Sequence, residues 1–362
     1  MRFGLYSELQ CHPWQTYQQV YGETQEQIVN ADRLGFDCYS IIEHWFFDQF
    51  GISANPFAFF AMAAARTRRI RFRTLLHVLP YHNPAVLASQ IAEMDLLTDG
   101  RYEFGVGRGH AWLPTKAGVP LDETRPRYEE AFDILMGLLE NQDGFSYDGK
   151  FWKLENARVV PRSQTKKFRI FTGGTSDRTY ELAGEHGWGV VVPPLLPYEA
   201  LHEQLEVYRE SCAKHGNEPD IVFIHAVYMD EDEATVRREA EDWIHNFLAG
   251  NASPGTELPP ADELNAVGYQ FYTSGALESL AEMTWEQLTE SDAVWAGTPE
   301  QVIEKIEALR EKCPGLAEVT ITVNAGGVEH WKAIKSQELF ARHVIPHFRG
   351  APTRGPVASI SL

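Results

Sequence analysis

The chain has 362 residues, of which 44% are hydrophobic and 23% charged, a composition typical of a globular protein. Its 51 acidic and 32 basic residues leave a formal net charge of −19, which argues against nucleic acid or an anionic membrane as a partner. No apolar run reaches the roughly 20 residues that span a bilayer, and the four cysteines form no closely spaced pair, so we expect a cytoplasmic protein without disulfides.

Strand and helix signals alternate along the chain, and several helix starts are marked by capping residues. Thr24-Gln25-Glu26-Gln27 is a capping-box pattern, and Gly35 is a typical helix end. Asn55-Pro56 and Asn83-Pro84 each place a capping residue before a proline, and Thr298-Pro299-Glu300-Gln301 combines both signals. Between the helical segments we predict strands at residues 2–6, 37–43, 70–78, 102–106, 168–172, 188–192, 220–228 and 317–323.

Eight strands that alternate with helices indicate an α/β protein with a parallel sheet, and this number favours a closed (β/α)8 TIM barrel. A doubly wound open sheet is the alternative, but the first strand is not followed by the GxGxxG pattern that would support it. In a barrel of this kind, functional residues lie at the C-terminal ends of the strands.

The second predicted strand ends in Glu43-His44, two polar residues that a buried strand does not need for packing. An imidazole is suited to giving or taking a proton near neutral pH, so His44 is a candidate catalytic residue. Glu43 is a second candidate, which either orients His44 or binds the barrel rim.

The third predicted strand carries His77, which we expect to face inward, close to any bound ligand. Together with His44 and His82 it raises the possibility of a metal site. Metal-dependent barrel hydrolases usually carry an HxH pattern on the first strand, and residues 3–8 have none, so we predict no metal.

The fourth predicted strand runs into Gly105-Val106-Gly107-Arg108-Gly109. Glycines at alternate positions let a flat ligand or a phosphate approach the backbone closely. Arg108 offers a planar cation for an anion, and Arg125, at the start of the next long helix, offers a second one. Arg127 is interpreted as a solvated helix charge.

The fifth predicted strand leads into glycines and hydroxyl residues at a helix start. Free N–H groups and the positive end of the helix dipole would bind an anion there, although ordinary helix capping is the alternative. With Arg108 and Arg125, this segment favours a phosphate site. Its candidate binding residues are Gly173, Gly174, Thr175, Ser176 and Thr179.

A long segment between the seventh and eighth predicted strands interrupts the alternation. Residues 249–260 are rich in proline and glycine, and several aromatic residues follow. We interpret residues 249–294 as a lid over a pocket, with an insertion of no function as the alternative. The predicted organisation is one barrel domain, 1–349, and a C-terminal tail, 350–362.

These motifs, in this order, resemble the bacterial luciferase-like family of flavin-dependent monooxygenases across nearly the whole chain. The matching segments are Glu43-His44-Trp45-Phe46, Phe50-Gly51, Asn55-Pro56, Val78-Leu79-Pro80, Asn83-Pro84, residues 93–101, Phe104-Gly105-Val106-Gly107-Arg108-Gly109 and residues 297–302.

The resemblance implies a barrel that binds reduced FMN at its C-terminal face and uses dioxygen on a small organic substrate. His44 then matches the catalytic histidine of the family, and Arg108, Arg125, Ser176 and Thr179 match positions that hold the flavin phosphate. The backbone near His77 and Gly107 would lie against the flavin ring.

Two positions depart from luciferase itself. Gly107 stands where luciferase has a reactive cysteine, and Trp45 replaces the second histidine of the usual Glu-His-His motif. Luciferase is one member of the family, so the resemblance does not by itself imply light emission.

Three further properties follow from the resemblance. Because no dinucleotide fingerprint is visible, reduced FMN would come from a separate flavin reductase. The 249–294 lid would exclude water during oxygen transfer. Helices at 55–66 and 84–97, apolar on more than one face, would contact a second copy in a homodimer, and burial of these faces under loops of a monomer is the alternative.

Three alternative functions remain open from the sequence. The first is a deazaflavin-dependent oxidoreductase on the same barrel, which transfers hydride without dioxygen. The second is a flavin-binding protein without catalytic activity, and the third is a metal-dependent barrel hydrolase.

Overall fold

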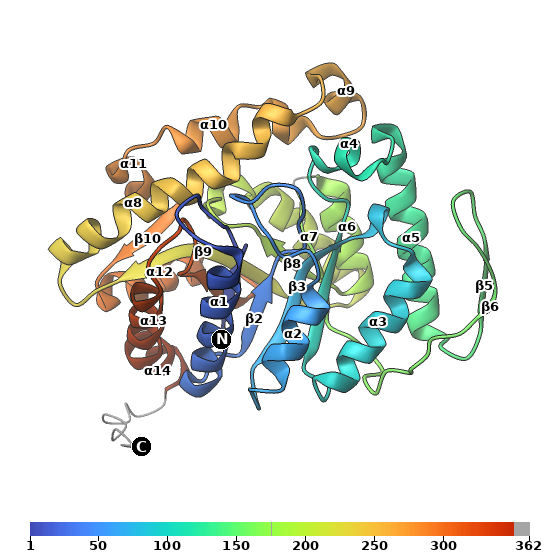
Figure 1. Ribbon diagram of the computed structural model, residues 1–362, viewed down its shortest axis with the longest axis horizontal. Helices are drawn as coiled ribbons and strands as arrows, with labels where there is room; N and C mark the ends of the chain where they lie inside the picture. The colour runs from blue at the N-terminus through green and yellow to red at the C-terminus, as the bar shows by residue number, and fades with distance from the viewer. Residues whose placement is uncertain (175, 351–362) are drawn as a thin grey trace.

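The computed structural model describes residues 1–174 and 176–350, and it forms a closed parallel barrel surrounded by helices (Figure 1). The strands pair in the order β1-β2-β3-β4-β7-β8-β9-β11, and β11 pairs with β1 to close the barrel. All eight predicted strands are present, which confirms the TIM-barrel prediction. They are β1 (Arg2–Ser7), β2 (Cys38–Ile41), β3 (Arg71–Val78), β4 (Tyr102–Gly107), β7 (Ile170–Thr172), β8 (Gly189–Val192), β9 (Ile221–Met229) and β11 (Leu316–Thr322).

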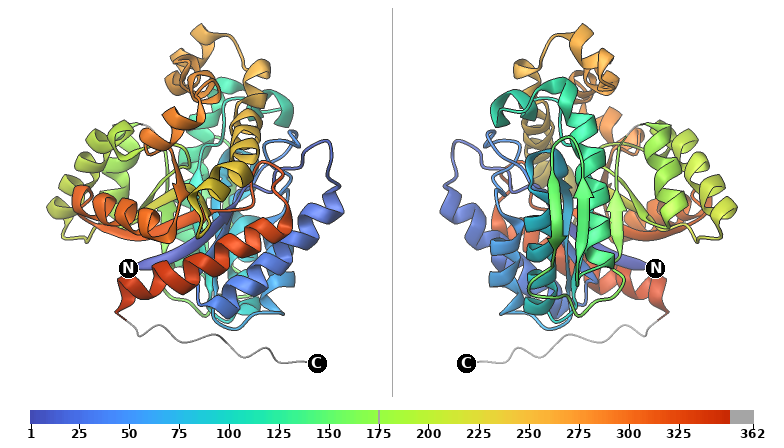
Figure 2. Two further views of the ribbon diagram at one scale, coloured as in Figure 1. Left: turned by 90° about the vertical axis from the view of Figure 1, so that its left-hand side faces the viewer. Right: turned by 90° about the vertical axis from the view of Figure 1, so that its right-hand side faces the viewer.

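Three strands were not predicted. Strand β10 (Val294–Gly297) pairs with the C-terminal part of β9, beyond the residues of β9 that pair with β8. Strands β5 (Phe145–Asp148) and β6 (Lys153–Ala157) form an antiparallel hairpin. Figure 2 shows this hairpin on the outside of the barrel, against α5 (Thr124–Glu140).

The helices between the strands begin mostly where the capping signals indicated. Asn55, Asn83 and Thr298 cap α2 (Pro56–Ala64), α3 (Pro84–Leu97) and α12 (Pro299–Lys312), as predicted. The remaining long helices are α6 (Asp177–His186), α7 (His202–His215), α8 (Glu233–Ala252) and α13 (His330–Leu339), and α14 (Ile345–Arg349) ends the described chain. None of the described helices is long and apolar enough to cross a membrane.

One predicted helix start was wrong. Helix α1 (Tyr17–Leu34) begins before the capping-box pattern at residues 24–27, because the Thr16 hydroxyl already accepts a hydrogen bond from the Gln19 amide at 3.1 Å. Thr24 instead lies buried in the middle of the helix. The predicted end is correct: Gly35 has a φ of 89°, a backbone conformation that favours glycine.

Residues 249–294 are mostly helical rather than an open loop. Helix α8 extends to Ala252, and η4 (Ser253–Glu257), α9 (Ala261–Ala266), η5 (Gln270–Thr273), α10 (Ala276–Ala281) and α11 (Trp285–Glu290) follow. In Figure 1 these short helices lie with α4 (Leu113–Ala117) across one end of the barrel. Of the predicted tail, only Gly350 belongs to the described residues.

A buried ion-pair network fills the N-terminal end of the barrel. Arg73 on β3 is fully buried, and its guanidinium donates to Glu103 on β4 and to Glu318 on β11 at 2.7–3.0 Å. Arg169, just before β7, reaches the same two carboxylates at 3.2 and 3.4 Å. The network joins four strands across the barrel interior, so the opposite end is the one left for a ligand.

Replacing Arg73 by methionine leaves Glu103 and Glu318 buried without their main cation. We expect a loss of about 3–5 kcal/mol in the free energy of unfolding, measured by urea denaturation. Arg33, whose ion pair with Glu338 is exposed, offers the matched control, and Arg33→Met should leave the midpoint nearly unchanged. Equal effects of both substitutions would contradict this role for the network.

Candidate active site

His44 lies after β2 at the C-terminal end of the barrel, with its ring completely buried. Its Nε2 accepts a hydrogen bond from the Trp112 indole N–H at 3.0 Å. Because an indole N–H can only donate, the neutral imidazole must carry its proton on Nδ1. Burial lowers the pKa of His44 well below its usual value, and the neighbouring His110 acts in the same direction.

The side chains around His44 form an aromatic cluster, here called the mouth and defined as His44, Phe50, His110, Trp112 and Tyr272. The Phe50 ring centroid is 4.3 Å from that of His44, and His110 stacks on Trp112 at 4.5 Å. Tyr272, from the 249–294 segment, shares a hydrogen bond of 2.8 Å with His110 Nδ1. The mouth is thus filled by protein side chains, and residues 249–294 contribute to it directly.

The sequence reasoning assigned no role to His110 or Trp112. They lie two and four residues after Arg108, at the same strand end, so their position was the signal that could have identified them. Tyr272 was grouped with the aromatic residues of the lid, but its partner could not be read from the chain.

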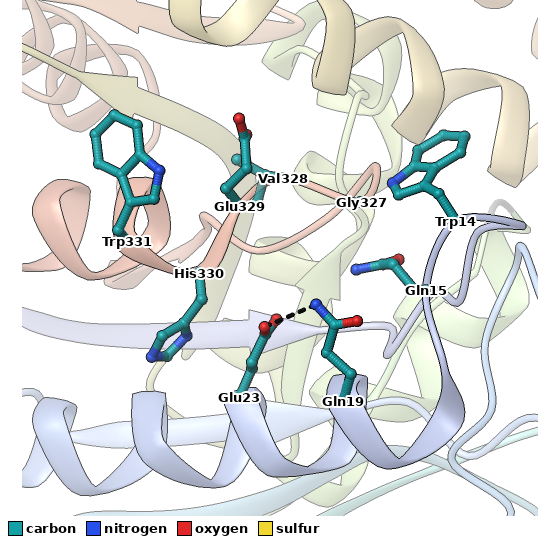
Figure 3. A pocket seen from close by; sticks show the side chains of 9 residues that line it. All are labelled: Trp14, Gln15, Gln19, Glu23, Gly327, Val328, Glu329, His330 and Trp331. Atoms are coloured by element: carbon teal, nitrogen blue, oxygen red, sulfur yellow. Dashed lines mark hydrogen bonds between the residues drawn. The ribbon is translucent and has the colours of Figure 1, made fainter.

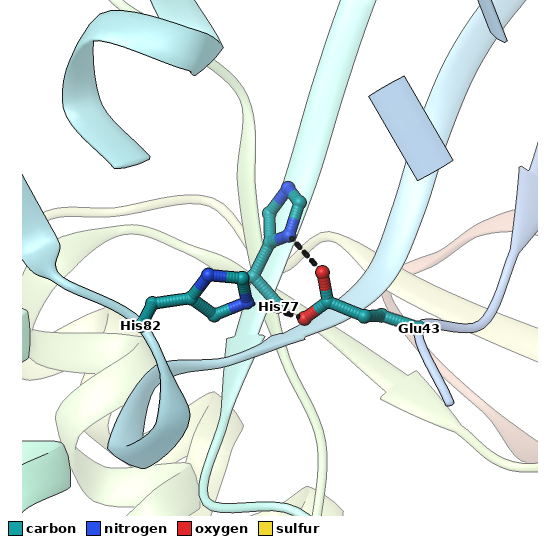
Figure 4. A group of neighbouring side chains, drawn as sticks. All are labelled: Glu43, His77 and His82. Carbon is teal, nitrogen blue, oxygen red and sulfur yellow. Dashed lines mark hydrogen bonds and ion pairs between the residues drawn. The ribbon is translucent and has the colours of Figure 1, made fainter. Parts of the chain in front are cut away.

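Glu43 does not orient His44. Its carboxylate faces the end of β3, where it accepts hydrogen bonds from the Val78 amide at 2.9 Å and from His82 Nε2 at 2.7 Å (Figure 4). A longer contact of 3.4 Å joins it to His77 Nδ1. Of the two roles considered for Glu43, the structure therefore favours binding the barrel rim.

These contacts also determine the ionisation of Glu43. Burial alone would raise the pKa of Glu43, but the charges and hydrogen bonds of His77 and His82 outweigh it and hold the pKa at about 2. Of the two histidines, His77 lowers the pKa of Glu43 more, although His82 makes the shorter contact, 2.7 Å against 3.4 Å. Burial lowers the pKa of His77, whereas Glu43 raises the pKa of His82 against the effect of burial.

The expectation that His77 faces the barrel interior was wrong. Its ring stacks on Phe57 of α2 at 4.9 Å, and its Nε2 is 2.8 Å from the Tyr102 hydroxyl, so the side chain lies between the sheet and the helices. The register of β3 against β4 shifts between Thr74 and His77, which reverses the expected alternation.

Glu43, His77 and His82 place three possible ligand atoms for a metal within 4.8 Å of one another. Both imidazoles approach the same carboxylate, and Val78 occupies one of its oxygens as well. Hydrogen bonds account for this arrangement fully, and Tyr102 satisfies the far nitrogen of His77.

Gly105 and Gly107 have a packing role in the structure. A Cβ atom at Gly105 would lie 2.3 Å from Leu76 Cδ2, and one at Gly107 would lie 2.6 Å from Leu76 Cδ1. The Leu76 side chain therefore occupies the space that the sequence reasoning assigned to a ligand. A contact between a ligand and the Gly107 backbone stays a prediction.

Arg108 and Arg125 come together at the edge of the 249–294 segment. The Arg108 guanidinium donates to the carbonyls of Val267 and Gly268 at 2.6 and 2.7 Å and lies 3.6 Å from the centre of the Tyr269 ring. Burial lowers the pKa of Arg108, and the charge of Arg125 contributes in the same direction. Two carbonyl oxygens thus stand where an anion was predicted.

The predicted anion cradle leads into α6. Ser176 is the N-cap residue of this helix, but its hydroxyl makes no capping bond and instead lies 2.9 Å from the Thr179 hydroxyl. Ordinary capping by Ser176 is therefore not observed. Gly173 and Gly174 are partly exposed, whereas Thr175 lies outside the described residues.

Comparison with known proteins agrees with this arrangement. The family model described as luciferase-like monooxygenase matches residues 1–313. The chain belongs to this family.

Relatives in the family carry out more than one kind of reaction. The chain is 26% identical over 348 residues to the alkanal monooxygenase alpha chain of Photobacterium leiognathi, with 93% of this chain and 96% of the relative covered. It is 25% identical to the oxygenase component of flavin-dependent trigonelline monooxygenase of Acinetobacter baylyi, covering 100% of this chain and 99% of the relative. It is also 26% identical to 5,10-methylenetetrahydromethanopterin reductase of Archaeoglobus fulgidus, covering 91% of this chain and 96% of the relative.

A solved structure supports the same fold. A monooxygenase of Streptomyces bottropensis superposes on this chain with a TM-score of 0.79 and 25% identity, covering 96% of this chain and 100% of the other. The family predicted from the motifs at Glu43-His44 and Gly105–Gly109 is therefore confirmed.

Two surface grooves lie outside the mouth of this luciferase-like protein. One, of about 620 Å³, runs beside it and is lined by residues that include Trp45, Tyr81, His82 and Arg127. The other, of about 630 Å³, lies between the start of α1 and the loop before α13, where Trp14 and Trp331 face each other across it (Figure 3). None of the predicted site residues lines this second groove.

Glu43 should contribute to stability in a pH-dependent way. Its folded-state pKa is lowered from 4.5 to about 2, so its contribution is complete above pH 4.5 and is lost as the pH falls towards 2. We expect Glu43→Gln to reduce the free energy of unfolding by about 3 kcal/mol at pH 7, and the difference from wild type to shrink below pH 4.5. Denaturant titrations between pH 7 and pH 3 measure this, and a difference independent of pH would contradict it.

Proposed function

We propose that this chain is the oxygenase of a two-component, FMN-dependent monooxygenase that acts on a small organic substrate. Reduced FMN would supply the electrons that activate dioxygen, so that substrate, dioxygen and reduced FMN give oxygenated substrate, water and oxidised FMN. The observation that carries the proposal is the family match over residues 1–313 combined with a buried, neutral histidine at the barrel mouth.

His44 has the properties required of a residue that holds a proton at a defined atom. Its Nε2 is engaged by Trp112, so the proton is on Nδ1, and this nitrogen is buried. The Gly51 backbone approaches the ring, but no hydrogen bond of normal geometry forms to Nδ1. A bound ligand would supply the missing partner by accepting a hydrogen bond from Nδ1–H. His44 would give up this proton during oxygen transfer only as Nε2, released by Trp112, takes another in its place, so that the ring stays neutral.

A second buried polar atom at the mouth lacks a partner. The Tyr81 hydroxyl, close to Arg108, Tyr269 and Tyr272, makes no hydrogen bond to any described residue. Buried polar groups are normally paired, so these two unpaired atoms at this end of the barrel favour a polar ligand here. The residues present therefore fit a flavin, provided that the 249–294 segment moves to admit it.

The phosphate of FMN would bind at the ends of β4 and β7. Tyr128, one turn after Arg125 on α5, neighbours Thr172 at the end of β7, so this part of α5 lies close to the strand that leads into the α6 cradle. Arg125 is exposed and makes no ion pair with the described residues. Arg125, the Ser176 and Thr179 hydroxyls and the first amides of α6 would hold the phosphate, with Arg108 joining them after release from the Val267 and Gly268 carbonyls.

The chain would receive reduced FMN from a separate reductase. One relative is the oxygenase component of a flavin-dependent system, and this sequence has no dinucleotide fingerprint of its own. A homodimer also remains a proposal. Met62, Val86 and Leu97, on α2 and α3, are more than half exposed and offer an apolar surface for a second copy.

A deazaflavin-dependent hydride transfer is the second candidate, because one solved structure with a similar fold is an alcohol dehydrogenase that depends on the deazaflavin F420. The two proposals differ in the cofactor that the protein binds. Anaerobic titration with reduced FMN and with a reduced deazaflavin decides between them, and binding of the deazaflavin alone would overturn the oxygenase proposal.

Substitution of His44 tests its proton-handling role and the idea of a non-catalytic flavoprotein. We expect His44→Ala to bind FMN normally but to lower product formed per dioxygen consumed by about 10²-fold. His215, an exposed histidine on α7, is the control, and His215→Ala should behave as wild type. The measurement supplies reduced FMN to a substrate found by oxygen-consumption screening, and an unchanged product yield in His44→Ala would exclude this role.

Arg125 and Arg127 form a matched pair on the same helix. Arg127 donates to Glu123 at 2.9 Å, whereas Arg125 is available for the phosphate. We expect Arg125→Ala to weaken FMN binding by about tenfold or more, since it removes a charge-assisted hydrogen bond. Binding of riboflavin, which lacks the phosphate, should not change in the same titration.

Arg127→Ala should leave the ratio of FMN to riboflavin affinity as in wild type. Equal weakening of both ligands by Arg125→Ala would place the phosphate elsewhere.

A further inference from the structure

Glu8 is a buried acidic residue at the mouth end of β1, and the sequence reasoning gave it no role. On β1, Gly4 faces the barrel interior, because a Cβ atom there would lie 2.7 Å from Thr320 Oγ1 and 3.0 Å from Glu318 Oε1. Alternation along the strand then points Tyr6 inward as well, and Tyr6 packs in the interior apolar cluster with Leu75 and Phe171. Glu8 lies two residues after Tyr6 on the same face, just beyond the end of the strand.

The partners of Glu8 differ from those of every other buried acidic residue in the described chain. Glu43, Glu103 and Glu318 are paired with histidine or arginine. Asp95 and Glu130 accept hydrogen bonds from two and three backbone amides, respectively. Glu8 forms no ion pair with a described residue, and its recorded amide donors are the side chains of Gln10 and Asn251.

These partners leave one oxygen of Glu8 free of amide donors. Gln10 Nε2 and Asn251 Nδ2 both donate to Oε2, at 3.3 and 3.1 Å. The Tyr6 hydroxyl is the remaining side-chain partner. Because Oε2 already accepts two N–H bonds, Oε1 is the oxygen that carries a proton when the carboxyl is neutral.

Burial favours that neutral form. It raises the pKa of Glu8 to about 8, against the opposing hydrogen bonds from Asn251 and Tyr6. Of the groups that face Glu8, Tyr6 on β1 is titratable, and its own pKa is raised by burial. Gln10, on the following loop, and Asn251, on α8, are neutral amides, so no cation among them favours ionisation.

The 249–294 segment contacts Glu8 directly. Asn251 belongs to this segment, and Gly250 beside it allows close approach: a Cβ atom there would lie 2.7 Å from Gln10 Nε2 and 2.4 Å from the Gln49 carbonyl. The end of α8 therefore packs against Glu8 and Gln10. Movement of the segment would remove a hydrogen bond from Glu8 and admit water to it.

We propose that Glu8 is a second proton-donating residue of this site and that its Oε1 hydroxyl binds an oxygen atom of the ligand in the mouth. The inference rests on the proposed function. The O–H bond of Glu8 breaks as a new O–H bond forms on the ligand oxygen, which leaves a carboxylate, and water returns the proton once the segment opens. The site then favours neutral substrates that bear a hydrogen-bond-accepting oxygen over anionic ones.

The first test needs no cofactor. Infrared spectroscopy of the apoprotein between pH 6 and pH 10 detects the neutral carboxyl as a C=O absorption distinct from that of carboxylates. We expect a band that disappears with a midpoint near pH 8 and is absent from Glu8→Gln. Glu23→Gln, at a partly exposed position of α1, is the matched control and should retain the band. No band assignable to Glu8 at pH 7 would overturn the proposal.

The second test uses reduced FMN and dioxygen alone. The rate at which the bound flavin is oxidised should fall as the pH rises through about 8 in wild type. In Glu8→Gln we expect a rate of flavin oxidation about 10²-fold lower at pH 7, and this rate should not depend on pH. The FMN affinity of this variant should be unchanged. Glu8→Asp should recover the pH dependence. An unchanged profile in Glu8→Gln overturns the role of Glu8, whereas absence of FMN binding in wild type overturns the proposed function instead.

Asn251→Ala keeps Glu8 itself and covers the case in which Glu8→Gln does not fold. It removes a hydrogen bond that lowers the pKa of Glu8. The infrared midpoint should therefore move to higher pH, and a midpoint that stays in place would contradict the described contact.

Discussion

The Arg73 guanidinium fixes the geometry on which the rest of the barrel depends. It is fully buried and bridges Glu103 and Glu318, which lie on strands β4 and β11. An arginine fork holds two carboxylates with little angular freedom, so these strands keep a defined position around the barrel axis. The opposite ends of the strands are thereby held in place as well, and these ends carry His44, Arg108 and Gly173.

The barrel interior is arranged in layers of different polarity above this network. An apolar layer that includes Tyr6, Leu75 and Phe171 separates the ion pairs from the mouth. It keeps water away from the network and gives the mouth a floor of low polarity. Polar groups placed above such a floor have strongly shifted pKa values, as His44 and Glu8 do in opposite directions.

The sequence allowed the eight barrel strands to be predicted because each is an apolar, β-prone run bounded by turn residues. Helix starts at Asn55, Asn83 and Thr298 were predictable for a local reason, since a capping side chain bonds to an amide two or three residues away. The start of α1 was missed because two capping patterns compete there and Thr16, the earlier one, caps the helix.

The features that were not predictable depend on contacts distant in the chain. His77 was expected in the interior, but a register shift in β3 turns it towards α2. Arg108 was expected to bind an anion, which stays a prediction. Its partners in the structure, two carbonyls 159 and 160 residues away, could not be inferred from the sequence. The importance of Glu8 depends likewise on Asn251, 243 residues away.

The bonds between Arg108 and the Val267 and Gly268 carbonyls have a thermodynamic consequence. An anion that binds the same guanidinium must replace these carbonyls, so binding and release of the 267–268 turn are reciprocally linked. A change that strengthens the hydrogen bonds from Arg108 to the turn weakens the apparent affinity for the anion by the same factor. A bound anion weakens the binding of the turn equally. An anion bound to Arg108 would therefore bias the position of the 249–294 segment.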